Sequence, residues 1–544
     1  MNMNDDKKKK GMYWLLFAFL MLAVSFLSFY KLNVKYVDPW DEARHGVNAW
    51  EMMHGGSMIQ STYLKQADYY NLKPPLSMWG IMIGLAVFKD PVFGLRFYSA
   101  VCYLILTAMT GLFLRSISDK ASLFAMTGLC INMTPFLAHM IRAGDADSLY
   151  VLLFSIAMLS MMRIRKNHNY LYICGLCFSF AFLTKSFHAM TIAIIGALFL
   201  ILTGLLTKLR FKEWCIFICS CLLPAAAWAV LRYRIDGSEF FIRMWETDVM
   251  GRTTGELKNN ISPFYYYFSY YFGLMSGKLQ VYLFAAALVI TALALMLYAY
   301  MKSKSITKKA AESKISDAKE ENNKTANHED VSDIGLVLKR DIVTGFLLWI
   351  LIPLFGFSFV SNKLLWYQYP AVTGLMIFAG VAAAYITDLL KGKKVVPIVY
   401  MLLAFMCVWY YAGTLKIVNA QEGNELQLLI RAVAGDETAK SAVTFDPSWD
   451  PDVPDKSDRI KAYIDYDGSG GVWQQQDVFV AEAYGAYECQ NGGVLELLIT
   501  DVKDNVSCIL FASKKMLDDC GVLYEDYPVI ARCGEFTAFA YDGS

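Results

Sequence analysis

Apolar segments recur along the first 415 residues of the chain, and several are long enough to cross a lipid bilayer. A membrane-crossing segment must satisfy its backbone hydrogen bonds internally, so each one is expected to be a helix. Hydrophobic residues make up 56% of the 544 residues and charged residues only 18%, which is too apolar for a soluble protein of this size. The chain is therefore predicted to be a mostly α-helical polytopic membrane protein with about eleven or more transmembrane helices. The predicted spans lie near 12–32, 95–115, 121–138, 146–162, 168–184, 188–206, 213–233, 278–301, 341–360, 370–388 and 395–415.

Basic residues occur in every second loop between these spans, which sets the expected orientation in the membrane. Because Lys and Arg concentrate on the cytoplasmic side, the N-terminus is predicted to be cytoplasmic, and the first loop and the C-terminal tail extracytoplasmic. A signal peptide is the alternative for the first span, but no small-residue cleavage site follows it, which favours a membrane anchor. The expected location is the plasma membrane. The basic clusters are Lys7–Lys10, Arg115–Lys120, Arg163–Lys166, Lys208–Lys212, Lys302–Lys309 and Lys391–Lys394.

Composition divides the chain into two predicted domains. Residues 1–417 form the membrane domain, and residues 418–544 form a small soluble extracytoplasmic domain of the α/β or α+β class. The membrane domain includes a polar outer loop, 34–79, and a cytoplasmic linker, 303–338, which is rich in Lys, Glu, Asn and Ser and is predicted to be disordered. The C-terminal domain has strand-like runs at 478–481, 494–499, 507–511 and 529–531 and helix-like segments at 425–434 and 515–520.

Cysteine usage fits this division. Eight of the twelve cysteines lie in predicted spans, where a buried thiol behaves as a small apolar group. The other four lie in the tail, which on this topology faces an oxidising compartment, so two disulfides are predicted, with their pairing open. A zinc site is the less favoured alternative, because these cysteines are widely spaced and form no Cys-x-x-Cys motif. These four residues are Cys489, Cys508, Cys520 and Cys533.

The first outer loop carries the densest group of polar residues. Asp38 followed by Pro39 predicts a helix N-cap and first helical residue, with the helix running to about Met53. At helical spacing Asp41 and His45 share one face, which places a carboxylate toward a cavity. The alternative is that Asp41 and its neighbour Glu42 are solvated acids that complement the helix dipole.

Two short motifs in this loop carry a family resemblance. The first is Asp41-Glu42-Ala43-Arg44, and the second, about thirty residues later, is Lys73-Pro74-Pro75-Leu76. Together, after a first membrane helix, they resemble the first extracytoplasmic loop of the bacterial aminoarabinose transferases of lipid A. These are integral membrane glycosyltransferases of the GT-C fold, related to the protein O-mannosyltransferases. The resemblance implies an enzyme that transfers a sugar from a polyprenyl-phosphate donor to an extracytoplasmic lipid, glycan or protein.

Three further segments resemble the same family over roughly residues 35–370. The family has an Asp five positions after an Arg. Counted from Arg142, this spacing matches Asp147 rather than Asp145. The segment that ends at Lys185 resembles the family's Leu-Thr-Lys, and residues 358–370 resemble its Ser-Lys-Leu loop with a later Tyr. The structural alternatives are an N-cap role for Asp147 and a snorkelling role for Lys185.

The chemistry of such a transfer assigns a role to each candidate. As the glycosidic bond breaks, negative charge builds on the phosphate, and preplaced cations stabilise this charge. Because a phosphate leaves readily without a general acid, one carboxylate that acts on the acceptor suffices. Asp41 is expected to be this carboxylate, with Asp147 as orienter or second carboxylate, and a single displacement would invert the anomeric centre. The predicted phosphate contacts are Arg44, Lys73, Arg252 and Lys363, and the predicted pocket residues are Glu42, His45, Lys185 and Tyr367.

The resemblance leaves a metal site open. Relatives that bind a metal have a Glu before the Lys-Pro-Pro and a His shortly before the Arg of the long outer loop, whereas this chain has Leu72 before Lys73 and no such His before Arg252. Asp248 is a weak substitute, which leaves a divalent metal ion open and no cofactor certain. The expected partners are the sugar donor, the acceptor and the lipid bilayer, with no nucleic acid because the outer domain is acidic.

Two other classes compete with the glycosyltransferase. A transporter of lipid-linked glycan would also have many spans, but it would be expected to carry paired repeats with broken helices near the midplane, and no such repeat is found in the sequence. A non-catalytic membrane scaffold would not need Asp41 near Lys73.

Overall fold

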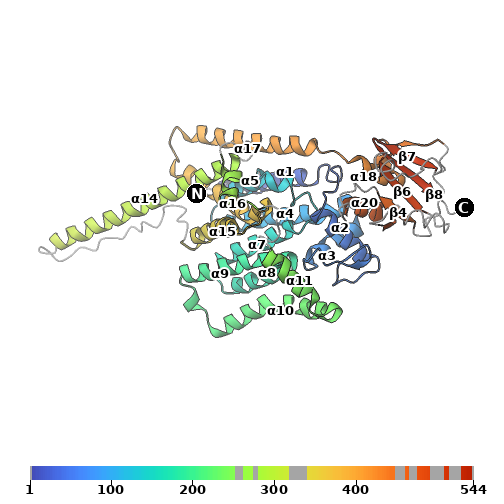
Figure 1. Ribbon diagram of the computed structural model, residues 1–544. Coiled ribbons are helices and arrows are strands. Elements are labelled where there is room, and N and C mark those ends of the chain that lie inside the picture. Colours follow the sequence, from blue (N-terminus) through green and yellow to red (C-terminus); the bar gives the residue numbers. More distant parts are fainter. Residues whose placement is uncertain are drawn as a thin grey trace.

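The computed structural model is a long helical bundle with a small sheet domain at one end (Figure 1). It describes residues 3–251, 261–273, 280–317, 340–447, 460–464, 475–490, 508–513 and 528–541. The end of α14 projects from the bundle on the side opposite the sheet, and the short elements α2 and α3 lie between the bundle and the sheet (Figure 1). The polar first loop and the C-terminal domain therefore share one end of the molecule.

The bundle is built mostly from long apolar helices. Its helices are α1 (Met3–Phe29), α3 (Leu76–Val87), α4 (Pro91–Arg115), α5 (Asp119–Cys130), α6 (Thr134–Leu137), α7 (Asp147–Met161), α8 (Asn169–Lys185), α9 (Met190–Leu202), α10 (Phe211–Asp236), α11 (Glu239–Trp245), α13 (Tyr266–Phe272), α14 (Gln280–Asp317), α15 (Arg340–Ser358), α16 (Tyr369–Leu389) and α17 (Val396–Asn419). Shorter turns are η1 (Ser186–Ala189), η2 (Leu206–Lys208), η3 (Glu246–Gly251) and η5 (Leu365–Gln368).

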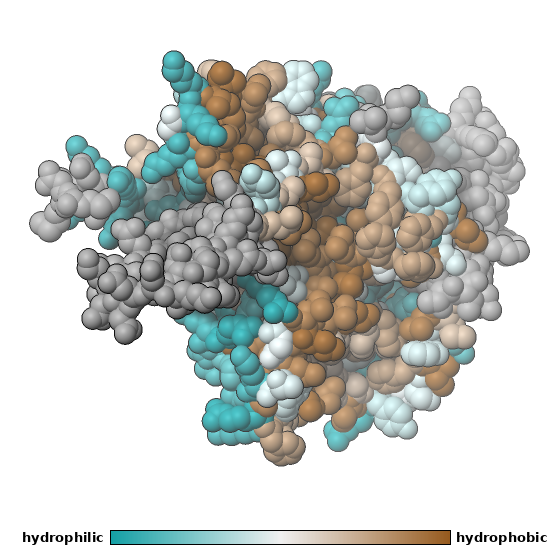
Figure 2. All heavy atoms as spheres, turned by 90° about the vertical axis from the view of Figure 1, so that its left-hand side faces the viewer, coloured by the Kyte–Doolittle hydropathy of each residue, from teal (hydrophilic) through white to brown (hydrophobic). Residues whose placement is uncertain are grey.

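Within the described ranges, eight helices are long and apolar enough to cross a membrane. One of them combines the predicted spans 168–184 and 188–206, because α8 and α9 are joined through η1. Two other predicted spans correspond to the shorter helices α5 and α7, so the count of eleven stays a prediction. Apolar side chains gather over a broad area of the bundle surface (Figure 2), as expected for helices that face lipid. The protein is a multi-pass membrane protein.

The predicted span 121–138 is interrupted in the structure. Its helix ends at Cys130, and the chain then continues through Asn132 to the short helix α6, in which Pro135 is one of the first residues. The Tyr282 hydroxyl donates to the Asn132 side chain at 2.7 Å, which holds the irregular turn inside the bundle. Because Pro lacks a backbone N–H and clashes with the preceding turn, it prevents one continuous helix here.

The prediction of a disordered linker over 303–338 is wrong for its first part. Helix α14 continues through residue 317, sixteen residues beyond the expected end of the span at 301. The remainder, 318–339, lies outside the described residues. Lys, Ala and Glu in this stretch are good helix formers, so a helix can extend from the membrane without apolar packing.

The first loop contains α2 (Asp41–Met53) and a hairpin of β1 (Thr62–Tyr63) and β2 (Gln66–Ala67). The helix begins at Asp41 rather than near Asp38, so the predicted N-cap is wrong. Asp38 instead forms an ion pair with Lys35, and its backbone N–H donates to Glu42 at 2.8 Å. The residue that precedes the helix is Trp40, in a left-handed conformation with φ of 71°.

The C-terminal domain has a mixed sheet of six strands in the order β3-β7-β8-β6-β4-β5. Strand β4 is parallel to β5 and β6, and the other pairs are antiparallel. The strands are β3 (Thr444–Phe445), β4 (Lys461–Ile464), β5 (Glu488–Gln490), β6 (Cys508–Ser513), β7 (Val529–Cys533) and β8 (Phe536–Tyr541), and the helices are α18 (Glu425–Val433), α19 (Glu437–Lys440) and α20 (Gln475–Gly485).

The predictions for this domain are partly confirmed. Strands are found at 507–511 and 529–531 and a helix at 425–434, as expected, whereas 494–499 and 515–520 lie outside the described residues. The predicted strand at 478–481 is wrong, because these residues form the middle of α20. All four are at most 2% exposed, and a short run that is apolar on every side does not distinguish a buried helix from a buried strand.

The predicted pair of disulfides is also wrong. Cys489 and Cys533 are free, buried thiols, Cys508 is buried at the start of β6, and Cys520 lies outside the described residues. The thiol of Cys533 donates to the Ala442 carbonyl at 3.4 Å. The thiols of Cys489 and Cys533 act as small apolar core groups in this domain.

Helix α20 packs directly on α2, which couples the C-terminal domain to the first loop. A Cβ atom at Gly46 would lie only 2.7 Å from the ring of Phe479, so only glycine allows this close approach. On α18, the Gln427 side chain accepts from the Val37 N–H at 2.9 Å and donates to the Val37 carbonyl at 3.2 Å. The C-terminal domain thereby fixes the position of the helix that begins at Asp41.

Candidate functional site

An ion pair between Asp41 and Lys73 joins the two motifs of the first loop. The Lys73 Nζ lies 2.9 Å from Asp41 Oδ1, and their side chains are 17% and 35% exposed. Burial opposes ionisation of Asp41, but Lys73 and the nearby histidines outweigh it, so the pKa of Asp41 lies below its usual range. Burial likewise opposes the charge on Lys73, but Asp41 and Asp145 raise its pKa. Both groups therefore remain charged at neutral pH.

A second and more deeply buried ion pair joins Asp147, the first residue of α7, to Lys185, the last residue of α8. Their side chains are 1% and 5% exposed. The second carboxylate oxygen of Asp147 accepts no hydrogen bond from the described residues. The Lys185 Nζ lies 5.8 Å from the centre of the Tyr367 ring, so three of the predicted residues meet here.

His139 and Asp145 link these two ion pairs. His139 Nδ1 lies 3.0 Å from Asp145 Oδ2, and its ring stacks on Trp366 with 3.7 Å between the ring centres. One nitrogen or oxygen atom from each of Asp41, His139 and Asp145 lies within 4.8 Å of the other two, which is close enough to hold a metal ion. Burial opposes protonation of His139, but Asp145 and Asp41 raise its pKa.

The metal-ligand group was missed from the sequence. Asp145 was passed over in favour of Asp147, and His139 belongs to no motif of the chain. The only available signal was the density of ionisable residues between two apolar segments, which usually marks a cavity. Asp248, the weak candidate from the sequence, instead accepts a hydrogen bond from the Ser186 hydroxyl at 2.8 Å.

Three of the seven described non-glycine residues with positive φ lie at or beside these residues. Trp40, His139 and Ser186 have φ of 71°, 52° and 46°, in the left-handed region that non-glycine residues seldom adopt. Trp40 directly precedes Asp41, and Ser186 directly follows Lys185. Such a conformation costs on the order of 1–3 kcal/mol and clusters at functional sites, where the surrounding structure enforces it. The strain therefore supports a functional role for the two ion pairs and His139.

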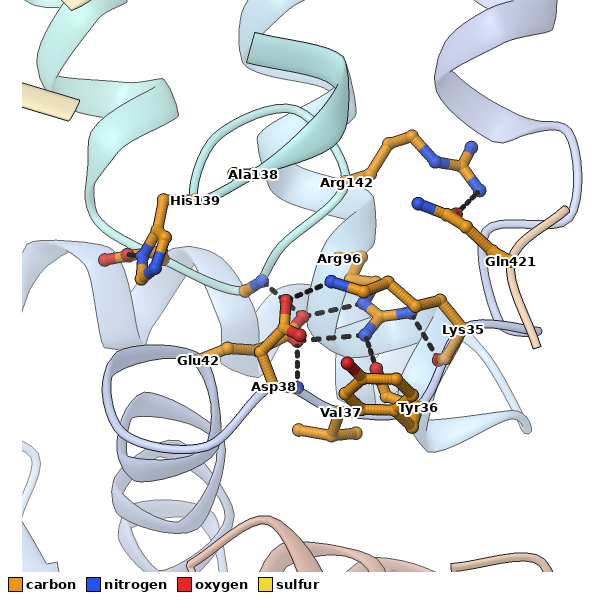
Figure 3. A network of polar contacts seen from close by, with 12 residues as sticks. Lys35, Tyr36, Val37, Asp38, Glu42, Arg96, Ala138, His139, Arg142 and Gln421 are labelled. Carbon is orange, nitrogen blue, oxygen red and sulfur yellow. Dashed lines mark hydrogen bonds and ion pairs between the residues drawn. The ribbon is translucent and has the colours of Figure 1, made fainter. Parts of the chain in front are cut away.

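Glu42, which the sequence suggested as a pocket residue, forms a buried ion pair with Arg96. Its carboxylate accepts from Arg96 Nε at 2.6 Å and Nη2 at 2.9 Å, and from the backbone N–H of Gly144 at 2.9 Å. The side chains of Glu42 and Arg96 are each 1% exposed. Figure 3 shows this network, in which Arg96 also reaches the backbone carbonyls of Lys35 and Tyr36. The pair connects the first loop to α4 and to the loop that carries His139.

Arg44 forms a buried ion pair with Asp68. Its guanidinium donates to both oxygens of Asp68, at 2.7 and 2.8 Å, and lies 3.7 Å from the centre of the Tyr63 ring. The Asp68 side chain is fully buried. Arg44 therefore stabilises the fold of the loop, and the predicted phosphate contact would require this ion pair to break.

Lys363 and His45, two other predicted site residues, are both buried. Lys363 is 4% exposed and donates to the carbonyls of Ser262 and Val360, and burial lowers its pKa. His45 is fully buried on α2, and its Nε2 has no hydrogen-bond partner among the described residues. Arg252 lies outside the described residues.

The site as described carries a small negative charge. Asp41, Asp145 and Asp147 contribute three carboxylates, whereas Lys73 and Lys185 contribute two ammonium groups. A proton on His139 would balance the remaining charge. A phosphate-bearing ligand would thus need a further cation beside these residues.

Comparison with known proteins finds that this bundle, with its paired carboxylates and lysines at one end, is similar to membrane glycosyltransferases. The family model of dolichyl-phosphate-mannose-protein mannosyltransferases matches residues 72–232. That stretch contains Lys73, His139, Asp145, Asp147 and Lys185.

Two relatives narrow the resemblance to the aminoarabinose transferases. Undecaprenyl phosphate-alpha-4-amino-4-deoxy-L-arabinose arabinosyl transferase 1 of Pseudomonas fluorescens (strain Pf0-1) is 24% identical over 260 residues, which cover 45% of this chain and 44% of that protein. The corresponding transferase of Pseudomonas savastanoi pv. phaseolicola (strain 1448A / Race 6) is 26% identical over 257 residues, which cover 45% of this chain and 47% of that protein. The matched region spans less than half the length of either relative.

Solved structures agree over nearly the whole chain. ArnT from Cupriavidus metallidurans bound to undecaprenyl phosphate has a TM-score of 0.63 at 14% identity, and the match covers 97% of this chain and 98% of that one. The apo form of the same protein has a TM-score of 0.63 at 13% identity, with 98% of both chains covered. At this identity the likeness establishes the fold, and the predicted fold class is confirmed.

Proposed function

We propose that this protein transfers a sugar from a polyprenyl-phosphate donor to an extracytoplasmic acceptor, with inversion at the anomeric carbon. The observation that carries the proposal is the Asp41–Lys73 ion pair, which lies beside the Asp147–Lys185 pair at the end of the bundle that bears the C-terminal domain. It is supported by two relatives named as transferases of an undecaprenyl-phosphate sugar and by an ArnT structure that contains undecaprenyl phosphate.

In the proposed reaction, the bond between the anomeric carbon and the phosphate oxygen breaks, and its electron pair stays with the phosphate. An acceptor oxygen forms the new bond from the opposite face. Lys73 and Lys185 are the described cations nearest this step, and they stabilise the growing negative charge more in the transition state than in the bound donor.

Asp41 acts in this scheme as a carboxylate that is ionised before the reaction begins. Because its pKa is lowered, it is a weaker base than an ordinary Asp, but it keeps the charge that stabilises a developing positive charge on the sugar. It also orients an acceptor hydroxyl by accepting its hydrogen bond and takes its proton as the new bond forms. An acceptor that is itself a phosphate would need no deprotonation.

A divalent metal ion would be held by Asp41, His139 and Asp145, whose oxygen and nitrogen donors suit such an ion. When bound, it would supply the positive charge that offsets the leaving phosphate. In the proposed topology, these residues and the C-terminal domain face the extracytoplasmic side, as the alternating basic loops predict.

The test compares membranes from cells with and without this chain. Membranes are given a polyprenyl-phosphate pool that carries a radiolabelled sugar, and label in glycolipid and glycoprotein is measured. The proposal expects a labelled product only when the chain is present. An unchanged product profile would contradict transfer, and movement of intact donor across the membrane would indicate the transporter instead.

A further inference from the structure

His139 lies in the irregular segment between α6 and α7, so no regular hydrogen-bond pattern fixes its backbone (Figure 3). Its φ of 52° is in the left-handed region, and its side chain is 22% exposed. The orientation of a histidine ligand governs metal affinity, because the coordinating nitrogen must point at the ion. If His139 binds a metal ion with Asp41 and Asp145, contacts from other segments must therefore orient its ring.

The turn η5 contacts one face of this ring. Trp366 stacks on His139 with 3.7 Å between the ring centres and an angle of 20° between the ring planes. A nearly parallel stack at this distance prevents the imidazole from rotating out of its plane. At the ring edge, Nδ1 lies 3.0 Å from Asp145 Oδ2. The stack and this edge contact together define where both ring nitrogens lie.

Two buried tyrosines of α13 hold the turn η5 in place. The Tyr267 hydroxyl donates to the Leu364 carbonyl at 3.0 Å, and the Tyr271 hydroxyl donates to the Leu365 carbonyl at 2.8 Å. Both tyrosines are 0% exposed, and the two carbonyls belong to the residues directly before Trp366. The indole that covers His139 is therefore carried by a turn that is fixed from inside the bundle.

The chain on the other side of this contact is also held. The Tyr369 hydroxyl, in the first turn of α16, donates to the Ala138 carbonyl at 2.6 Å. Ala138 directly precedes His139. The segment that contains Trp366 and Tyr369 thus contacts both the ring of His139 and the backbone beside it.

We propose that Trp366 is a positioning residue, which holds the imidazole of His139 in the orientation that binds a divalent metal ion together with Asp41 and Asp145. The sequence predicts roles for Lys363 and Tyr367 in the same segment but none for Trp366. Groups that orient a metal ligand without touching the metal change metal affinity by about 10–100-fold when they are replaced. The inference rests on the metal site of the proposed function, but not on sugar transfer.

A similar Trp–His pair elsewhere separates this role from ordinary packing. Trp50 contacts the ring of His54 with 3.9 Å between the ring centres and 32° between the ring planes. His54 is not part of the group of metal-ligating residues found among the described residues, which is Asp41, His139 and Asp145. Removing the Trp50 ring therefore removes a similar contact without changing the surroundings of a metal ligand.

The test measures Mn²⁺ binding to purified full-length protein in nanodiscs by electron paramagnetic resonance, without donor or acceptor. Trp366→Leu should weaken Mn²⁺ binding at least about tenfold. Trp366→Phe should retain most of the affinity, because a phenyl ring can also stack on the imidazole. Trp50→Leu should bind Mn²⁺ as wild type does. In His139→Glu, which keeps a ligand for Mn²⁺ but has no ring to orient, adding Trp366→Leu should cause no further loss.

Wild-type affinity in the Trp366→Leu protein would overturn the proposal. An equal loss from Trp366→Leu with His139 and with His139→Glu would also overturn it, because Trp366 would then act on the fold and not through His139. If the wild-type protein binds no Mn²⁺, the proposal fails as well, whereas sugar transfer by the same protein would still support the proposed function. Thermal unfolding of each variant establishes that it is folded. If Trp366→Leu does not fold, Trp366→Met decides, because its flexible side chain fills the space without presenting a planar face.

Discussion

The variants Glu42→Gln and Asp41→Asn, compared in the same assay, distinguish a structural role from a chemical role for the two acidic residues of the first motif. Glu42→Gln keeps the shape of the side chain but removes the counter-ion of Arg96, whose side chain is 1% exposed. Removing one partner of a buried ion pair costs about 3–5 kcal/mol, because the other charge is left buried and unpaired. Asp41→Asn should change stability far less, since the Asp41 side chain is 35% exposed.

The assay is unfolding of purified protein in mixed micelles with rising SDS, followed by tryptophan fluorescence. Glu42→Gln should unfold at clearly lower SDS than wild type, and adding Arg96→Met should recover part of the loss, because an apolar side chain needs no counter-ion. Asp41→Asn should unfold near the wild-type midpoint. A stable Glu42→Gln protein that has lost only transfer would refute the structural role and make Glu42 a site residue.

Three further predictions follow from the same structure. Treatment with EDTA should lower transfer, and Mn²⁺ should restore it. The variant Asp145→Asn should raise the Mn²⁺ concentration needed, whereas Asp248→Asn should not. Full activity of metal-free protein would count against a metal site at Asp41, His139 and Asp145. Single cysteines at Gln66 and Lys393, both exposed, should react with impermeant maleimide from opposite sides of the membrane, and labelling from one side would overturn the topology. Mass spectrometry after alkylation of denatured, unreduced protein should find Cys489 and Cys533 as free thiols, and a disulfide at either of them would contradict the structure.

The bundle could be predicted from the sequence because its signal is local. A long apolar run in a bilayer has one stable backbone structure, the helix, so runs such as 95–115 and 370–388 correspond to α4 and α16. Where the local signal was ambiguous, the prediction failed: the apolar run at 478–481 fits a buried strand as well as the middle of α20.

The site could be predicted in part, for the same reason. Asp41, Lys73 and Lys185 were identified from short motifs, and the structure brings each of them into an ion pair. The partners of Arg44 and Glu42 could not be identified, because Asp68 and Arg96 are defined by tertiary packing and carry no motif. Asp41 and Glu42 are neighbours in one motif, yet Asp41 pairs with Lys73 at the site and Glu42 pairs with Arg96 in the core.

The central claim is tested most directly by measuring sugar transfer and donor binding on the same purified protein. Asp41→Asn should lower transfer by at least about 100-fold, the typical worth of a positioned catalytic carboxylate, and leave binding of the polyprenyl-phosphate donor near the wild-type level. Lys73→Ala should weaken both, since it acts on the phosphate before and during bond cleavage. Near wild-type transfer by the Asp41→Asn protein would contradict the account.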